Sequence, residues 1–150
     1  MKASFTIVRK IMSEPVDDIH KPPTRGQAAK YELLSPMLDS ALEEMREFSK
    51  KKQDGVVNKT KIALLNRLMR DIKELLTDEP SNEYLDLLDE DMVPQNSDAV
   101  LILGQYRAAM NRFRSRHFRR DITGRGGKWI TKEEDEEEDT DTRGKAKGRR

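Results

Sequence analysis

Apolar residues are spaced most regularly between residues 58 and 76, where they recur every three or four positions. This spacing is typical of one face of an α-helix. The stripe consists of Ile62, Leu65, Met69, Ile72 and Leu76, and it is widened by Leu64, Leu68 and Leu75. A face of this width has to pack against more than one neighbour. The pattern therefore predicts a helix in the core of a bundle.

A second apolar stripe lies between residues 27 and 52, and it is interrupted by Pro36. Its members are Leu34, Leu38, Ala41, Leu42, Met45 and Phe48. Proline lacks a backbone N–H and fits the first position of a helix, so we favour a helix that is capped by Ser35 and starts at Pro36. The alternative is a short helix that starts at Gln27 and bends at the proline.

The third stripe lies between residues 97 and 120. It consists of Leu103, Tyr106, Met110, Phe113 and His117. Ser97 is the expected N-cap, and Asp98 would interact favourably with the positive end of the helix dipole. We expect this helix to end near Arg120, before the glycines at positions 124, 126 and 127.

The remaining segments carry weaker patterns. A short helix is predicted over residues 81–88, with Tyr84, Leu85 and Leu88 buried. Residues 1–12 alternate in a way that is typical of a short strand, or of an arm that docks elsewhere. Three prolines between residues 13 and 26 indicate an extended connector.

These patterns predict an all-α fold, a small helical bundle of three main helices and one short helix. The bundle is expected over residues 27–122. Residues 1–26 would form a flexible arm with a proline-rich connector, and residues 123–150 a disordered tail. Charged residues make up 38% of the chain and apolar residues 35%, so part of it has too little apolar surface to fold.

The composition also excludes several kinds of chemistry. The chain contains no cysteine, which excludes disulfides, thiolate catalysis and cysteine-ligated zinc. It has neither a secretory signal pattern nor an apolar run of about 18 residues, the length that a membrane span needs. We therefore expect a cytoplasmic protein that does not enter membranes.

The formal net charge of +1 conceals four segregated blocks. Residues 74–98 contain nine acidic residues and no lysine or arginine, and residues 107–130 contain eight basic residues and one acidic residue. Residues 131–141 then carry eight acidic residues and one lysine, and residues 143–150 five basic residues. Blocks separated by much more than about 8 Å act independently on partners at physiological salt.

Signs of catalysis are weak. His20 lies in the connector, and His117 lies on an apolar stripe, where packing or a role as a cation at the helix end is expected. The stretch TGRGGKW does not match a phosphate-binding loop. We therefore predict no enzyme activity, no cofactor and no metal site. The remote alternative is a carboxylate-dependent metal enzyme that would recruit Asp86, Asp89, Glu90 or Asp91.

The candidate binding site is the arginine-rich face of the third main helix and the segment after it. The candidate residues are Arg107, Arg112, Arg114, Arg116, Arg119, Arg120, Arg125, Lys128 and Trp129. Guanidinium groups bind phosphate and carboxylate equally well, and the indole of Trp129 could stack on a base. A structural explanation competes, because basic residues at the end of a helix interact with its dipole or pair with the acidic block.

We therefore predict a non-enzymatic interaction module, an accessory subunit of a larger assembly that binds a protein partner through these arginines. The alternative is a nucleic-acid-binding protein that uses the same surface for DNA or RNA. In that case the acidic run 133–141 would compete with the nucleic acid for residues 112–125. A homo-oligomer is compatible with either hypothesis.

Overall fold

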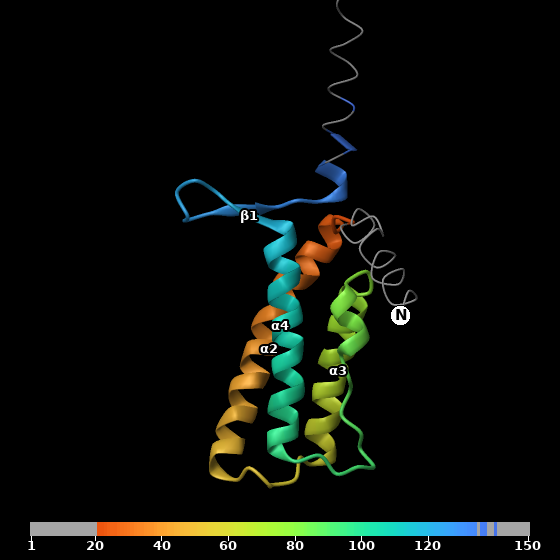
Figure 1. Cartoon of the computed structure of the whole chain (residues 1–150), viewed down its shortest axis with the longest axis vertical. Helices are drawn as coiled ribbons and strands as arrows, with labels where there is room; N and C mark the ends of the chain where they lie inside the picture. Colours follow the sequence, from red (N-terminus) through yellow and green to blue (C-terminus); the bar gives the residue numbers. More distant parts are fainter. Residues whose placement is uncertain (1–20, 135, 138–139, 141–150) are drawn as a thin grey trace, which may run out of the picture.

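The computed structural model describes residues 21–134, 136–137 and 140. Three long helices dominate this part of the chain: α2 (Arg25–Lys51), α3 (Lys59–Leu75) and α4 (Asn96–His117). A short 3₁₀ helix, η2 (Pro80–Tyr84), and two strands, β1 (Phe118–Arg120) and β2 (Gly127–Trp129), complete it (Figure 1). The predicted class, a helical bundle with three main helices and one short helix, is confirmed. None of the helices described is long and apolar enough to span a bilayer.

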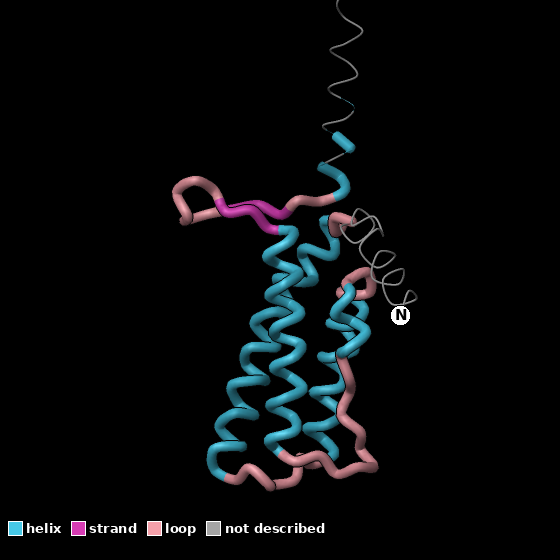
Figure 2. The backbone as a smooth tube through the Cα atoms, in the orientation of Figure 1, coloured by secondary structure: helices cyan, strands magenta, loops and turns pink. Residues whose placement is uncertain are grey.

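The three long helices lie side by side, and α2 packs against both α3 and α4 (Figure 2). The chain runs along α2, returns along α3, and follows an extended stretch back to the start of α4. The loop between α2 and α3 meets the stretch that leads into α4 at this end of the bundle. The Val57 N–H donates to the Pro94 carbonyl at 2.9 Å, and the Asn96 N–H donates to the Gly55 carbonyl at 2.8 Å.

The core consists of the apolar stripes of the three helices. The largest side chains with less than 2% exposure are Leu38, Ile62, Met69, Ile72, Leu76, Leu103, Tyr106 and Met110. Each buried leucine, isoleucine or methionine contributes about 1.5–3 kcal/mol relative to an exposed one. The Tyr106 hydroxyl donates to the carbonyl of Asp86 at 3.0 Å, which satisfies its polar atom, and burial raises the pKa of this phenol.

The start of α2 differs from the favoured prediction. The helix begins at Arg25 and continues through Pro36, although the proline cannot donate a hydrogen bond to the carbonyl of Glu32. Thr24 caps it, and the Gln27 side chain accepts a hydrogen bond from the Thr24 N–H in return. This capping box holds the first turn in place ahead of the proline. The prediction of a helix that starts at Pro36 is therefore wrong.

The other helix boundaries need smaller corrections. The helix predicted between residues 58 and 76 is α3, which begins after its N-cap, Asn58, and ends at Leu75. Helix α4 begins after Gln95 rather than Ser97, and the Asp98 carboxylate accepts a hydrogen bond from the Gln95 N–H at 2.9 Å. It ends at His117, so residues 118–120 are not helical.

The predicted short helix over residues 81–88 is also corrected. It is a single 3₁₀ segment that ends at Tyr84, whose side chain is 73% exposed. Leu85 and Leu88 are buried as expected, but they lie in the extended stretch that follows. The Asn66 side chain fixes this stretch because it bonds to both the N–H and the carbonyl of Leu88, at 2.9 and 2.8 Å.

A β-hairpin replaces the last predicted turn of α4 and the beginning of the predicted disordered tail. Strands β1 and β2 pair antiparallel, with Phe118 opposite Trp129 and Arg120 opposite Gly127. Gly124 has a φ of 69°, which suits glycine because it has no Cβ. The hairpin projects from the end of the bundle (Figure 1). The expectation that disorder begins at residue 123 is therefore wrong for this segment.

The chain after the hairpin contacts the beginning of α2. The Lys132 N–H donates to the Pro23 carbonyl at 3.0 Å, and the Glu133 carboxylate accepts from the Arg25 N–H at 3.1 and 3.2 Å. These contacts tie residues 131–133 to the bundle. Of the predicted flexible arm and connector, residues 1–26, the first twenty lie outside the described residues, and so do residues 141–150 of the predicted disordered tail. Thr24 and Arg25, near the end of the predicted connector, form the cap and the start of α2 instead.

Candidate functional site: a basic surface at the end of the bundle

Six of the nine predicted site residues lie in the last turns of α4 and on the hairpin that follows it. We call this the basic end surface. It consists of Arg112, Arg114, Arg119, Arg120, Arg125 and Lys128. All are exposed except Arg114, which is partly buried. Among the described residues, none of its five arginines forms an ion pair, and Lys128 lies 3.6 Å from the carboxylate of Glu134.

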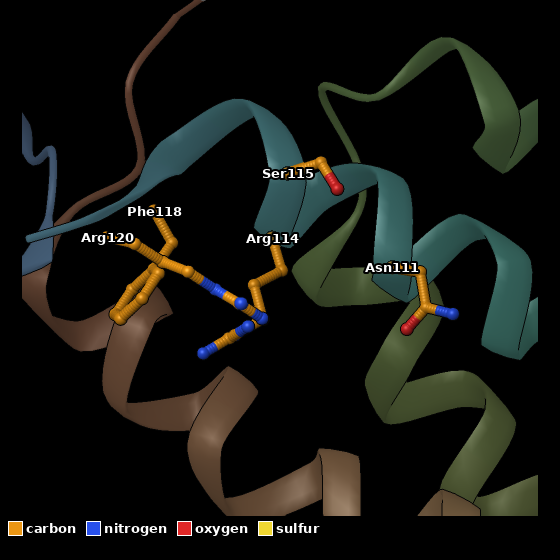
Figure 3. Close-up of a pocket in the computed structure, with 5 residues that line it drawn as sticks. All are labelled: Asn111, Arg114, Ser115, Phe118 and Arg120. Atoms are coloured by element: carbon orange, nitrogen blue, oxygen red, sulfur yellow. The ribbon is translucent and has the colours of Figure 1, made fainter. Parts of the chain in front are cut away.

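An open pocket of about 410 Å³ lies within this surface, where the last turns of α4 meet β1. It is lined by Asn111, Arg114, Ser115, Phe118 and Arg120 (Figure 3). The guanidinium carbon of Arg114 lies 4.2 Å from the centre of the Phe118 ring, in a cation–π contact. The pocket thus combines two guanidinium groups, an amide, a hydroxyl and an aromatic ring.

Arg107 does not belong to this surface. Its guanidinium contacts the carboxylate of Asp39 and donates to the Ser35 hydroxyl at 3.1 Å. Both partners lie on α2, so the arginine joins two helices of the bundle. The structure therefore assigns this predicted binding residue an internal role.

Arg116 is also used internally. Its guanidinium donates to the Glu79 carboxylate at 2.8 Å, and the Glu79 side chain is only 5% exposed. The Nε2 atom of His117 lies 3.1 Å from the other oxygen of the same carboxylate. Two consecutive residues of α4 therefore hold one buried acid that precedes η2.

The acidity of Glu79 results from opposing effects. Burial would raise the pKa of its carboxyl group, because it disfavours the charged form. The hydrogen bond with His117 and the charge of Arg116 outweigh burial and lower the pKa below its usual value. Glu79 is therefore held as a carboxylate in a site where an unpaired charge would be costly.

Trp129 is enclosed by other aromatic rings. Its ring centre lies 5.0 Å from that of Tyr31, 5.9 Å from Phe113 and 5.5 Å from Phe118. Its Nε1–H donates to the Glu32 carboxylate at 2.9 Å. These contacts anchor the hairpin on α2 and α4. They give the indole a structural role, and its stacking on a base stays a prediction.

The acidic run 133–141 was predicted to compete for the arginines of residues 112–125, and only part of it can be compared with the structure. Glu133 binds the first turn of α2, so this residue is not placed to compete for the arginines. Glu134 does approach Lys128, as the competition hypothesis requires. Residues 135, 138–139 and 141 of the acidic run lie outside the described residues.

The carboxylates that were considered for a metal do not converge. Asp86, Asp89, Glu90 and Asp91 are all exposed. Within the described ranges, no group of three or more histidine, aspartate or glutamate side chains is placed to hold a metal ion. The metal-enzyme alternative has no supporting observation.

Sequence reasoning found the basic residues but missed Glu79, which decides the role of Arg116. Glu79 and Arg116 are 37 positions apart. No local pattern marks such a pair.

Comparison with protein-family models, curated proteins and solved structures gives no match. The role of the basic end surface therefore has to be inferred from its residues and their geometry.

Proposed function

We propose that the protein is a non-enzymatic helical interaction module, an accessory subunit of a larger assembly. Its basic end surface binds an acidic surface of a protein partner. Arg119, Arg120 and Arg125 lie on the hairpin and are exposed, so a partner can reach them. Arginine suits this task because its planar guanidinium donates two parallel hydrogen bonds to a carboxylate.

One observation carries the proposal: the five arginines of this surface have no ion-pair partner among the described residues. Arg107 and Arg116, by contrast, contact internal carboxylates. Fold stability accounts for these two arginines and, in part, for Arg114, which lies on the Phe118 ring. It leaves Arg112, Arg119, Arg120 and Arg125 unexplained. Arg125 also lies seven residues after the C-cap of α4, beyond the last turn in which the helix dipole has its effect.

Nucleic acid is the second candidate partner, and the pocket beside Phe118 favours it. Arg114 and Arg120 could bind phosphate there, while Asn111 and Ser115 offer hydrogen bonds to a base or a sugar. A projecting two-stranded ribbon also has a width that the major groove of DNA admits. Lys128 and Arg125 would add phosphate contacts along the hairpin.

Affinity purification from the native cell, with and without nuclease, tests the proposal. The bait is the full chain, compared with a double variant, Arg119→Ala/Arg120→Ala. A matched control, Arg46→Ala/Arg70→Ala, removes two exposed arginines from α2 and α3. We expect the partner to be lost with the first double variant and retained with the control.

Nuclease treatment then separates the two candidate partners. A protein that remains bound after nuclease, and depends on Arg119 and Arg120, supports the accessory-subunit proposal. Bound material that nuclease removes supports nucleic acid. In that case the affinity for a labelled duplex should fall with salt, with a log–log slope of about 0.9 for each phosphate neutralised. Equal retention by both double variants would overturn both candidates.

A further inference from the structure

An apolar groove runs between α2 and α3, outside the basic end surface. It is open and has a volume of about 940 Å³. Leu33 and Met37 of α2 and Leu64 of α3 line it, with 64%, 51% and 62% of their surface exposed. Apolar side chains that gather on one face usually mark a contact site.

The groove lies where a fourth helix would complete the bundle. Helix α2 packs against α3 and α4, and each helix turns its main apolar stripe inward. The residues of the groove form a second apolar strip on the outer sides of α2 and α3. In an antiparallel four-helix bundle, such a strip is covered by another amphipathic helix.

Residues 1–12 were predicted above as a short strand or as an arm that docks elsewhere. We propose the second of these, with the arm occupying this groove as an amphipathic helix. At 100° per residue, Phe5, Ile7, Val8, Ile11 and Met12 fall within an arc of about 160°, and Ser4 is the one polar residue in that arc. Lys2, Arg9 and Lys10 fall on the opposite side. Pro15 would end this helix soon after Met12. A helix of this length is only marginally stable alone, so the groove would stabilise it.

The dimensions of the chain agree with this placement. The groove follows α2 from Leu33 to Phe48, about 22 Å at 1.5 Å per residue, and a helix of twelve residues is about 18 Å long. Leu33 lies about 12 Å along α2 from Arg25. The eight residues 13–20 can span up to about 26 Å, so they can bring Met12 to the Leu33 end. The docked helix then runs antiparallel to α2.

The charges of the groove and of the arm do not oppose this placement, because the groove is lined by two acidic and two basic residues. Residues 1–12 contain Lys2, Arg9 and Lys10 but no acidic residue. Glu44 is the charged residue that α2 contributes to the groove, and it has no ion pair among the described side chains. On the α3 side, Lys61 lies 3.5 Å from the centre of the Phe48 ring, and Arg67 and Asp71 offset each other. With its apolar side in the groove, the docked helix would leave Lys2, Arg9 and Lys10 exposed to solvent, so docking would bury none of these charges.

Cysteine crosslinking in the full chain tests this proposal, because the natural sequence contains no cysteine. One variant carries Ile7→Cys and Leu64→Cys, which places one thiol on the arm and one in the groove. The matched control carries Ile7→Cys and Leu101→Cys. Leu101 is 66% exposed on α4 and does not line the groove. Both variants are treated with a short bismaleimide at low protein concentration.

We expect crosslinks within one chain to form several-fold more in the groove variant than in the control. Equal yields in the two variants would overturn the proposal. Crosslinks between chains that increase with protein concentration would also overturn it, because they would assign the groove to a second copy.

A second measurement does not depend on cysteine. The methyl NMR signals of Met37 and Leu64 are compared between the natural chain and a Phe5→Asp variant. Docking predicts that these signals shift while the Leu101 signals stay in place. Unchanged Met37 and Leu64 signals would contradict docking.

Discussion

The arginines inside the bundle and those of the basic end surface are the same residue type in one short stretch, but they have different roles. Arg116 lies one helical turn after Arg112, yet its guanidinium meets a buried carboxylate while Arg112 is exposed. Arg107 likewise joins α4 to α2. The location of the carboxylates, and not the density of arginine along the sequence, separates structural arginines from those available to a partner.

The difference follows from solvation. A charge taken out of water loses several kcal/mol of hydration, so Glu79 needs its partners in order to remain ionised. An exposed guanidinium stays hydrated and has no such requirement. Mutation of the internal arginines should therefore lower the stability of the fold, whereas mutation of the exposed arginines should weaken the binding of a partner.

Arg116→Ala should have the largest effect. It removes a partner of the buried Glu79 carboxylate, and we expect the free energy of unfolding to fall by about 3 kcal/mol. This loss is at the lower end of the range for broken buried ion pairs, because His117 still contacts the Glu79 carboxylate. Urea unfolding followed by circular dichroism measures it.

Arg112→Ala is the matched control for that prediction. It removes the same side chain one turn earlier on α4, and the free energy of unfolding should change by less than about 0.5 kcal/mol. Similar losses in the two variants would contradict the division between structural and exposed arginines.

A lower pH should have the next largest effect, because it weakens the interaction of Glu79 with Arg116 and His117. The pKa of Glu79 is lowered in the folded chain, so its stabilisation is complete above the unfolded pKa, about 4.3, and is lost as the pH falls through the folded value. The urea midpoint of the natural chain should therefore decrease below that pH. In Glu79→Gln this contribution should be absent, and an identical pH profile in the two proteins would count against the pair.

Arg107→Ala should have a smaller effect than Arg116→Ala. Its partner, Asp39, has a side chain that is 57% exposed, so water screens the pair. We expect the free energy of unfolding to fall by about 1 kcal/mol or less. Asp39→Asn should lower it by no more than this, because Arg107 keeps its hydrogen bond to Ser35. A larger loss in Asp39→Asn than in Arg107→Ala would contradict the assigned pair.

Single replacements on the hairpin should have the smallest effect on stability. Arg119→Ala or Arg125→Ala should change the free energy of unfolding by less than about 0.5 kcal/mol. Trp129, the single tryptophan of the chain, provides the readout because its fluorescence reports the anchoring of the hairpin. A shift of its emission in the folded state would show that these arginines help to hold the hairpin.

The core could be predicted from the sequence because helical periodicity is a local property. The stripe through Ile62, Met69 and Ile72 identifies α3, and the structure buries all three residues. The path of the chain at Pro36 could not be predicted in the same way. There the Thr24 capping box and the burial of Tyr31 and Leu34 outweigh the loss of one hydrogen bond.

The hairpin and the internal pairs depend on contacts that are distant in sequence. Strands of three residues carry almost no pattern, and β2 is positioned because Trp129 packs on Tyr31 and Phe113. The role of Arg116 likewise depends on Glu79. The sequence therefore predicted where the basic residues gather, but not which of them have internal partners.

Elution from a heparin column tests the central claim most directly, because heparin presents a dense array of anionic groups. The quadruple variant Arg112→Ala/Arg119→Ala/Arg120→Ala/Arg125→Ala is compared with a control that loses four exposed cations elsewhere, Arg46, Arg67, Arg70 and Lys59. The account predicts that the first variant elutes at much lower salt than the control, while both keep the helical content of the natural chain. Elution of the two variants at the same salt would contradict it.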